Sequence, residues 1–271
     1  MNYFYFLFFL ALIFIASLQD LKRREVDNWL NLFIFFCGFI FVFINAIFYK
    51  EISYLTNLAF ASFFIFLLVN FLYISKIFSG GDCKLLFSLT PLFVSVDFLR
   101  TFLNSFYFIC ILSITSAFYG LIWILFLFFS NFNETKKEFF VVFKKNFYFL
   151  LLSLIFLVFS IFFKESFLFF LLIFFLLIFY FLSLSLNKTV LIKEVFTKDL
   201  REGDWLEKDL KIKGRTIKSS FEGLSLKDIE FIKKNLKKVR IKDGIPLAPA
   251  FFFAFIVFYF FDFYLFYNFF L

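Results

Sequence analysis

The chain has 271 residues, of which 63% are hydrophobic and 59 are Phe, and its formal net charge is +8. The sequence contains no His and only three Cys, each isolated, which excludes histidine-based catalysis, histidine metal sites, CxxC zinc sites and a disulfide framework. Any hydrolytic chemistry therefore falls to carboxylates, Lys, Tyr or Ser, and we expect neither a metal nor an organic cofactor.

Long apolar runs dominate the chain, and about 20 such residues suffice to cross the hydrocarbon core of a bilayer. We predict an all-α polytopic membrane protein of about eight transmembrane helices, with a small α+β domain before the last helix. The division that we expect is a transmembrane core at 1–186, a polar domain at 187–246 and a final helix at 247–271. The predicted spans lie at 3–18, 29–49, 52–75, 83–98, 102–129, 147–163, 166–186 and 247–268.

The distribution of basic residues sets the expected orientation. With eight spans, 25 of the 28 Lys and Arg residues lie on one face of the membrane, and only Lys50, Arg100 and Lys164 lie on the other. Basic loops stay preferentially on the cytoplasmic side. We therefore predict a multi-pass protein of the cytoplasmic membrane, with segment 187–246 in the cytoplasm.

Segment 187–246 changes composition abruptly and has the patterns of a small folded domain. TVLIKEVF at 189–196 is typical of a strand, and EGD at 202–204 indicates a turn. Two further strands are expected around Lys213-Gly214, and a helix is expected after Ser225, with Asp228 completing the cap. Its lysines favour a surface that faces anionic lipid headgroups, because the interspersed acidic residues and the lack of an RNA-binding motif argue against nucleic acid.

Two carboxyl groups stand where membrane helices begin or end. Asp20 follows the first span and Asp82 begins the fourth, so two intervening spans place both at the cytoplasmic boundary. Two carboxyls that share a partly desolvated site do not both ionise, so one takes a proton from water while the other protonates a peptide carbonyl. We expect Gly80 and Gly81 to adopt backbone conformations closed to other residues and to let an extended peptide approach closely.

Two stretches carry a resemblance to a known family. LQDLKRREVDNWLN at 18–31, followed by SGGDCKLL at 79–86, resembles the two signatures of the type IV prepilin peptidases, which are aspartic intramembrane proteases of the GxGD type. EGDWL, GLSLKDIE and KDGIPLAP resemble the archaeal branch, which processes archaellins and pilins. The resemblance covers residues 1 to about 250, apart from the hairpin at 147–186.

The resemblance implies catalysis by Asp20 and Asp82 on prepilin or prearchaellin precursors, whose short basic leader is cut at the cytoplasmic boundary. Two positions depart from the family pattern, since Ser79 stands where GxGD has its first glycine and Asp27 stands where the family often has proline. Supporting or substrate-binding roles are implied for Gly80, Gly81, Lys84, Gly244 and Pro246.

Other functions stay open at this point. A protease of the presenilin or signal-peptide-peptidase type also uses GxGD, but its first aspartate lies in the span just before that motif, whereas Asp20 lies three spans earlier. A non-catalytic transport or assembly protein would carry further charges in mid-span, which the sequence does not show. An inactive peptidase homologue would hold the two carboxyls too far apart to share one water.

Overall fold

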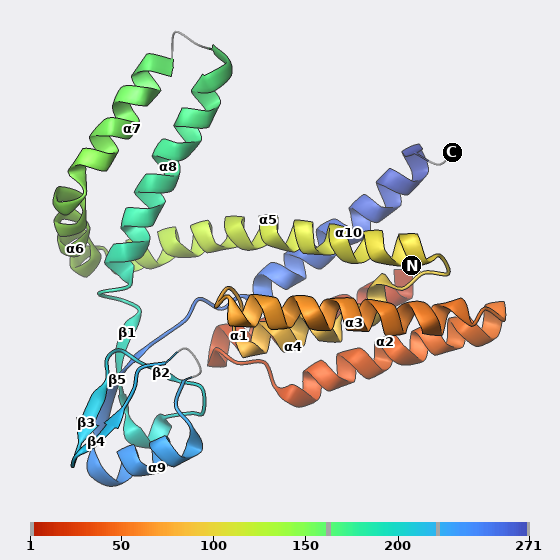
Figure 1. Cartoon of the computed structure of the whole chain (residues 1–271), viewed down its shortest axis with the longest axis horizontal. Helices are drawn as coiled ribbons and strands as arrows, with labels where there is room; N and C mark the ends of the chain where they lie inside the picture. The colour runs from red at the N-terminus through yellow and green to blue at the C-terminus, as the bar shows by residue number, and fades with distance from the viewer. Residues whose placement is uncertain (1–2, 161–163, 221–222, 270–271) are drawn as a thin grey trace. The chain divides into compact units, whose positions relative to one another are not determined.

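The structure, a computed structural model, describes residues 3–160, 164–220 and 223–269, without the side chains of 164–166 and 261–269. The chain forms two compact units, one of Met1–Gly120 with Ile245–Leu271 and one of Leu121–Gly244. Most of the described chain is helical, and the strands lie near the C-terminal end of the sequence (Figure 1).

The described part of the first unit is helical. Its helices are α1 (Tyr3–Arg23), α2 (Asn28–Tyr49), α3 (Ser53–Ile74), the short α4 (Gly80–Ser88), the 3-10 helix η1 (Thr90–Phe93), α5 (Phe98–Ser130), which continues into the second unit, and α10 (Ala248–Phe269). Within the described residues, 5 helices are long and apolar enough to span a membrane, namely α1, α2, α3, α5 and Phe167–Leu186 of α8. The number is 6 if the bent pair Phe132–Lys145 and Phe147–Ser160 counts as one span. The prediction of a multi-pass helical membrane protein is confirmed, whereas the count of eight is not.

The predicted span at 83–98 is not one regular helix. Its helical part, α4, has 9 residues, about 14 Å at the rise of an α-helix, against a hydrocarbon core of about 30 Å. Pro91 in η1 lacks an N–H and cannot continue the α-helical ladder. The irregular backbone is buried in protein, where Leu89, Thr90 and Phe93 are 0% exposed, as irregular backbone at membrane depth requires.

Despite this break, the segment runs antiparallel to α3 over most of the length of that helix. Near its start, the Cys83 thiol donates to the Val69 carbonyl oxygen (3.4 Å). Near its end, the Asn57 side-chain amide donates to the carbonyl oxygens of Ser95 (2.9 Å) and Val96 (2.7 Å). The chain therefore passes from the C-terminal end of α3 to its N-terminal end, as the fourth crossing was expected to do, with a broken helix.

Helix α2 packs tightly against η1 at Gly38, and this contact gives a stability prediction. A Cβ on Gly38 would lie 2.8 Å from Pro91 Cβ and 3.1 Å from Pro91 Cγ. Because the proline ring is rigid, we expect Gly38→Ala to lower the free energy of unfolding by about 1–3 kcal/mol. The matched control is Gly120→Ala in α5, where a Cβ meets nothing within 4 Å and Ala favours the helix. The midpoints of thermal unfolding in detergent compare the two variants. Equal midpoints would contradict the close contact of Gly38 with Pro91.

Helices α1 and α10 lie antiparallel. Phe6 stacks on Tyr259 with ring centroids 3.9 Å apart, and the Ser17 hydroxyl, nearer the end of α1, donates to the Ala248 carbonyl oxygen (3.0 Å). The first turn of α10 therefore lies against the C-terminal part of α1. The core around these helices includes the fully buried Phe9, Ile13, Phe251 and Phe255.

The second unit begins with three helices after α5. They are α6 (Phe132–Lys145), α7 (Phe147–Ser160) and α8 (Lys164–Leu186). Segment 130–146, expected as a loop, is helical instead and bends by 73° into α7. Its exposed lysines cover one face, while Thr135 and Val142 are buried. The segment is therefore an amphipathic helix, whose many charged residues are equally typical of a loop. Helices α7 and α8 pack together, as the predicted hairpin requires, and residues 161–163 of its first span lie outside the described residues.

The polar segment folds as expected into strands and one helix. Its three-stranded antiparallel sheet has the order β1 (Ile192–Phe196), β5 (Lys238–Lys242), β2 (Trp205–Leu206). Strands β3 (Leu210–Ile212) and β4 (Arg215–Ile217) form a hairpin whose turn residues have positive φ, 46° at Lys213 and 81° at Gly214. Helix α9 (Leu226–Asn235) packs on a small core that consists of Leu200, Leu206, Ile212, Ile217, Leu224, Ile229, Ile232 and Val239.

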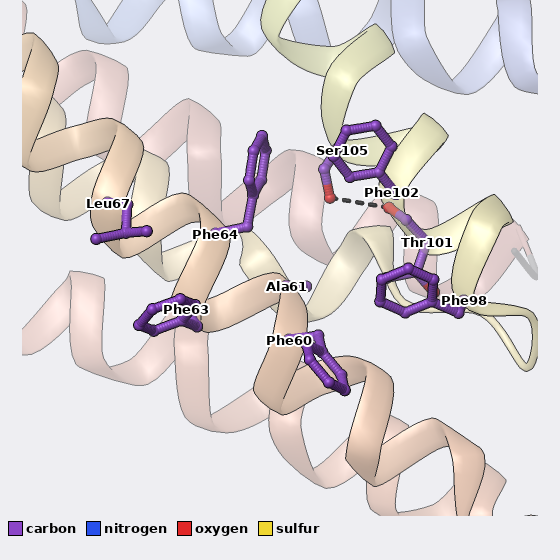
Figure 2. Close-up of a pocket in the computed structure, with 9 residues that line it drawn as sticks. All are labelled: Phe60, Ala61, Phe63, Phe64, Leu67, Phe98, Thr101, Phe102 and Ser105. Atoms are coloured by element: carbon purple, nitrogen blue, oxygen red, sulfur yellow. Dashed lines mark hydrogen bonds between the residues drawn. The ribbon is translucent and has the colours of Figure 1, made fainter.

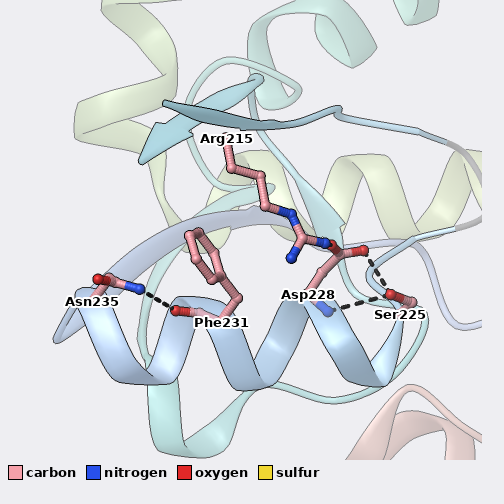
Figure 3. Close-up of polar contacts among 5 residues, drawn as sticks. All are labelled: Arg215, Ser225, Asp228, Phe231 and Asn235. Atoms are coloured by element: carbon pink, nitrogen blue, oxygen red, sulfur yellow. Dashed lines mark hydrogen bonds and ion pairs between the residues drawn. The ribbon is translucent and has the colours of Figure 1, made fainter. Parts of the chain in front are cut away.

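The N-terminus of α9 carries a polar cluster that ties it to the hairpin (Figure 3). The Ser225 hydroxyl donates to Asp228 Oδ2 (2.6 Å) and accepts from the Asp228 backbone N–H (3.3 Å). Arg215 forms an ion pair with Asp228 (2.7 Å) and lies 4.9 Å from the centre of the Phe231 ring. The predicted cap at Ser225 is confirmed, and the same Ser-x-x-Asp arrangement recurs elsewhere in the chain.

Candidate active site

Five helix ends of the first unit meet at one end of the bundle, and the two predicted carboxyls lie there. Asp20 lies in the last turn of α1, which contacts the start of α10. Asp82 lies in the first turn of α4, close to the C-terminal end of α3. The start of α2 joins this group because Lys84 Nζ donates to Asn28 Oδ1 (2.9 Å).

Asp20 is held by the first turn of α10. Its side chain is 7% exposed, and Oδ2 accepts a hydrogen bond from the Ala248 backbone N–H (2.8 Å). The first N–H groups of a helix have no partner within the helix and favour a carboxylate. The Ser17 hydroxyl, one turn earlier in α1, fixes the same residue through its carbonyl oxygen (3.0 Å), so Asp20 has a defined orientation.

Asp82 is held by the residue that begins its own helix. Ser79 is the N-cap of α4, and its backbone N–H and its hydroxyl both donate to Asp82 Oδ2, at 3.0 Å and 2.6 Å. In return, Ser79 Oγ accepts from the Asp82 backbone N–H (3.3 Å). This reciprocal capping box leaves Asp82 partly buried and occupies one of its two carboxyl oxygens.

The two carboxyls act on each other electrostatically. Asp82 lies outside the helices long enough to span a membrane, and burial raises its pKa from 3.8 to about 6, against the lowering effect of the Ser79 hydroxyl and with a further rise from the charge on Asp20. A carboxyl pair with one raised pKa is the arrangement that supplies a base and an acid to one reaction.

The two signature stretches of the sequence are joined in space. The bond from Lys84 to Asn28 links the start of α4 to the start of α2. Phe35 and Phe87 then stack with ring centroids 5.5 Å apart, so α2 and α4 run side by side in the same direction. Lys84 is exposed and positions α4 relative to the loop that follows Asp20.

Asp27, the residue where the family often has proline, closes the loop between α1 and α2. Its carboxylate accepts from Arg23 (2.7 Å) and from Trp29 Nε1 (3.1 Å), and its backbone N–H donates to Gln19 Oε1 (3.0 Å). These contacts give the short loop a fixed path without proline.

Gly80 and Gly81 require a correction. Both lie in the regular first turn of α4 and neither has a positive φ, so the expectation of backbone conformations closed to other residues is wrong. A Cβ on Gly80 would meet a Tyr73 ring atom at 3.9 Å, and one on Gly81 would meet Ser79 Oγ at 3.7 Å. Because these are ordinary contacts, packing within the described chain does not require glycine, and close approach of a peptide stays a prediction.

The two other supporting residues lie in different settings. Pro246 is buried and precedes by two residues the Ala248 that binds Asp20. Gly244 is exposed, and a Cβ there would meet nothing within 4 Å. The structure therefore links Pro246 to the neighbourhood of Asp20 and provides no comparable contact for Gly244.

The sequence analysis assigned no role to two residues near the site, Tyr119 and Ser79. The phenol oxygen of Tyr119 in α5 is buried, and the charges of Asp20 and Arg24 both act on this side chain. No local pattern marks Tyr119, because its position depends on the packing of α5 against α10. Ser79, by contrast, had a signal, since Ser79-x-x-Asp82 repeats the capping pattern recognised at Ser225.

An apolar groove in the first unit is a separate feature. It has a volume of about 220 Å³ and lies between α3 and α5, and its lining is Phe60, Ala61, Phe63, Phe64, Leu67, Phe98, Thr101, Phe102 and Ser105 (Figure 2). Its lining contains no titratable group, and the Ser105 hydroxyl donates to the Thr101 carbonyl oxygen (2.9 Å). The groove therefore has no acid or base for hydrolysis.

Comparison with known proteins agrees with the resemblance seen in the motifs. Residues 7–121 match the type IV leader peptidase family, and the matched stretch contains both Asp20 and Asp82. The predicted relationship to the prepilin peptidases is confirmed by this match. No curated protein and no solved structure matches the chain.

Proposed function

We propose that this chain, which the match over residues 7–121 assigns to the type IV leader peptidases, is a membrane aspartic endopeptidase that removes the short basic leader from prepilin-like or prearchaellin precursors. The observation that carries the proposal is the pairing of Asp20 and Asp82. Each carboxyl has a backbone N–H donor, and the charge on Asp20 acts on Asp82.

The distribution of charge in the first unit supports a cytoplasmic site. The end that holds Asp20 and Asp82 carries five basic residues, Lys22, Arg23, Arg24, Lys76 and Lys84, whereas the α2–α3 turn and the start of α5 carry Lys50 and Arg100. By the positive-inside rule, the end with more basic residues faces the cytoplasm. A precursor whose apolar helix lies in the bilayer and whose leader stays in the cytoplasm would present its scissile bond at this boundary.

The proposed reaction uses the two carboxyls in different protonation states. Ionised Asp20 takes a proton from water, and the water oxygen forms a bond to the carbonyl carbon of the scissile amide. Protonated Asp82 gives its proton to the carbonyl oxygen, which makes a neutral tetrahedral diol. The diol then collapses, the C–N bond breaks, and the proton held on Asp20 moves to the leaving nitrogen while a diol proton returns to Asp82.

The geometry suits this division of roles. Ser79 occupies Asp82 Oδ2, so the proton of Asp82 falls on Oδ1, the oxygen that we assign to the substrate carbonyl. We assign the proton to Asp82 because burial raises its pKa to about 6, so this carboxyl keeps a proton to a higher pH than an ordinary aspartate. The absence of side chains on Gly80 and Gly81 leaves room for an extended peptide beside this carboxyl.

The placement of Asp20 weighs against the presenilin-like alternative. In that arrangement the first aspartate lies in the helix just before the GxGD stretch, and here that helix is α3, whose described residues Ser53–Ile74 contain no Asp. A transport or assembly function has less support. The charge on Asp20 acts on the Asp82 carboxyl, and two interacting carboxyls are the arrangement expected for acid–base catalysis at one peptide bond.

Release of a leader by the purified full chain in detergent would test the function directly. The substrate panel consists of precursors with a short basic leader followed by an apolar helix of about 20 residues, and mass spectrometry identifies the two fragments. We expect a single cut at the junction of leader and helix. If no precursor of the panel is cut by a folded preparation, the peptidase proposal is overturned and the transport alternative becomes the better hypothesis.

A further inference from the structure

Ser79 holds one oxygen of the Asp82 carboxyl with two donors. Two donors from this single residue converge on one carboxyl oxygen, the hydroxyl at 2.6 Å and the backbone N–H at 3.0 Å from Asp82 Oδ2. A glycine, which the GxGD pattern has here, supplies the backbone donor and no hydroxyl. The shorter of the two bonds therefore exists because this chain has Ser at position 79.

Several described residues around Asp82 bear on the charge of its carboxyl. Burial raises the pKa of Asp82 most, both Ser79 bonds lower it, and the charge on Asp20, from α1, raises it further. Lys84, on the same helix as Asp82, is bonded to Asn28, and the Cys83 thiol donates to Val69. From α3, Tyr73 lies beside Gly80. Ser79 is thus the main described group that favours the ionised carboxylate.

We propose that Ser79 is a positioning residue whose hydroxyl orients the Asp82 carboxyl and sets the pH range in which the enzyme is active. The proposal rests on the peptidase function proposed above. A hydroxyl that donates to a carboxylate stabilises the charged form. Its removal makes Asp82 keep its proton to a higher pH, so the alkaline side of the activity profile moves upward.

The test is the dependence of kcat/KM on pH for the full chain, because this ratio reports the ionisation of the free enzyme. We expect both Ser79→Gly and Ser79→Ala to move the alkaline limb upward by about 1 pH unit. Glycine is nearly as good an N-cap as serine, whereas alanine is poor, so Ser79→Gly separates loss of the hydroxyl from loss of helix stability. An alkaline limb that stays in place in both variants overturns the proposal.

Ser225→Ala is the matched control. Ser225 donates to Asp228 Oδ2 at the same 2.6 Å and accepts from the Asp228 N–H at the same 3.3 Å as the Ser79–Asp82 pair. This substitution removes the same two hydroxyl bonds in α9 and is expected to leave the profile unchanged. A shift as large as that of Ser79→Gly would show that cap loss in general moves the profile, which also overturns the proposal.

A second measurement keeps this inference separate from the proposed function. The infrared band of the Asp82 carboxyl is assigned by its loss in Asp82→Asn, and its titration needs no substrate. We expect Ser79→Gly to raise the midpoint of that titration by about 1 unit. If the wild type cuts no precursor, the function fails while the midpoint still decides the role of Ser79. If the wild type cuts and the midpoint does not move, the role of Ser79 fails alone.

Discussion

Asp82→Asn and Asp20→Asn are each expected to lower kcat/KM for leader cleavage by about 10³-fold or more, since positioned proton transfer contributes roughly 10²–10⁴-fold and the two carboxyls act on one bond. An asparagine keeps the shape of the side chain, and its oxygen can accept the same bonds, from Ser79 in one case and from the Ala248 N–H (2.8 Å) in the other. It cannot exchange a proton, so the loss should fall on kcat.

The chain offers a close control for the first of these variants. Asp228 shares with Asp82 the two bonds to the hydroxyl of the N-cap serine, here Ser225. The Asp228→Asn substitution also weakens an ion pair with Arg215 (2.7 Å). We expect Asp228→Asn to cleave precursors at the wild-type rate. Retention of cleavage in either Asp20→Asn or Asp82→Asn would show that the substituted aspartate is structural.

The thermal stability of Asp82→Asn shows whether a loss of activity comes from the missing carboxyl or from unfolding. Because the pKa of Asp82 rises from 3.8 to about 6 in the folded protein, the native state binds more protons than the unfolded state between these values. Its contribution to stability is therefore present at low pH and declines as the pH rises from about 4 to about 6. At pH 7 the buried charge is unfavourable, so thermal unfolding should find Asp82→Asn at least as stable as the wild type.

The location of Asp20 and Asp82 at the same end of the bundle was predictable because it depends on regular features. Helices α2 and α3 are long apolar runs without breaks, and two crossings return the chain to the same boundary. The packing of α10 on α1 was not predictable in this way. Nothing local to Asp20 indicates that its carboxylate binds the Ala248 N–H, a residue 228 positions later, because such a contact depends on tertiary structure.

The errors of the sequence analysis have physical causes as well. Hydropathy does not distinguish a regular transmembrane helix from a buried segment with a broken helix. The apolar run at 83–98 was therefore predicted as one span, although its helix α4 is short. Pro91 was the sequence feature that indicated a break. The charge of α6 is that of a loop, although its buried positions follow helical spacing. The glycines of the GGD stretch were assigned an unusual backbone, whereas a helix N-terminus accommodates them in ordinary geometry.

Gly223→Ala is expected to unfold the small domain of segment 187–246. Gly223 has φ of +78°, and a Cβ on it would overlap the carbonyl oxygen of Gly203. The two segments are held together there, because the Gly203 N–H donates to the Leu224 carbonyl oxygen (3.0 Å) and the Leu224 N–H donates to the Asp204 carbonyl oxygen (2.9 Å). Backbone strain of about 1–2 kcal/mol adds to a steric cost of about 1–3 kcal/mol, a large share of the stability of so small a core.

Gly214→Ala is the matched control, since φ at Gly214 is +81° and a Cβ there meets nothing within 4 Å. Gly214→Ala has the strain of a positive φ but no overlap with another backbone atom. Limited proteolysis should therefore cut Gly223→Ala within the domain and leave Gly214→Ala largely intact. Equal resistance of the two variants would contradict the close approach of Gly203 and Gly223.

The same pair of variants tests what the domain does. Segment 187–246 holds 16 Lys and Arg against 10 Asp and Glu, so it does not attract a basic leader by charge and is better suited to anionic headgroups. The role that remains to be tested is selection among precursors. Gly223→Ala should then cleave poor precursors faster relative to good ones while kcat for the best precursor changes little, because Asp20, Asp82 and the groups bonded to them lie in the other unit. Unchanged selectivity in an unfolded domain would remove that role and leave the domain only a structural or lipid-binding one.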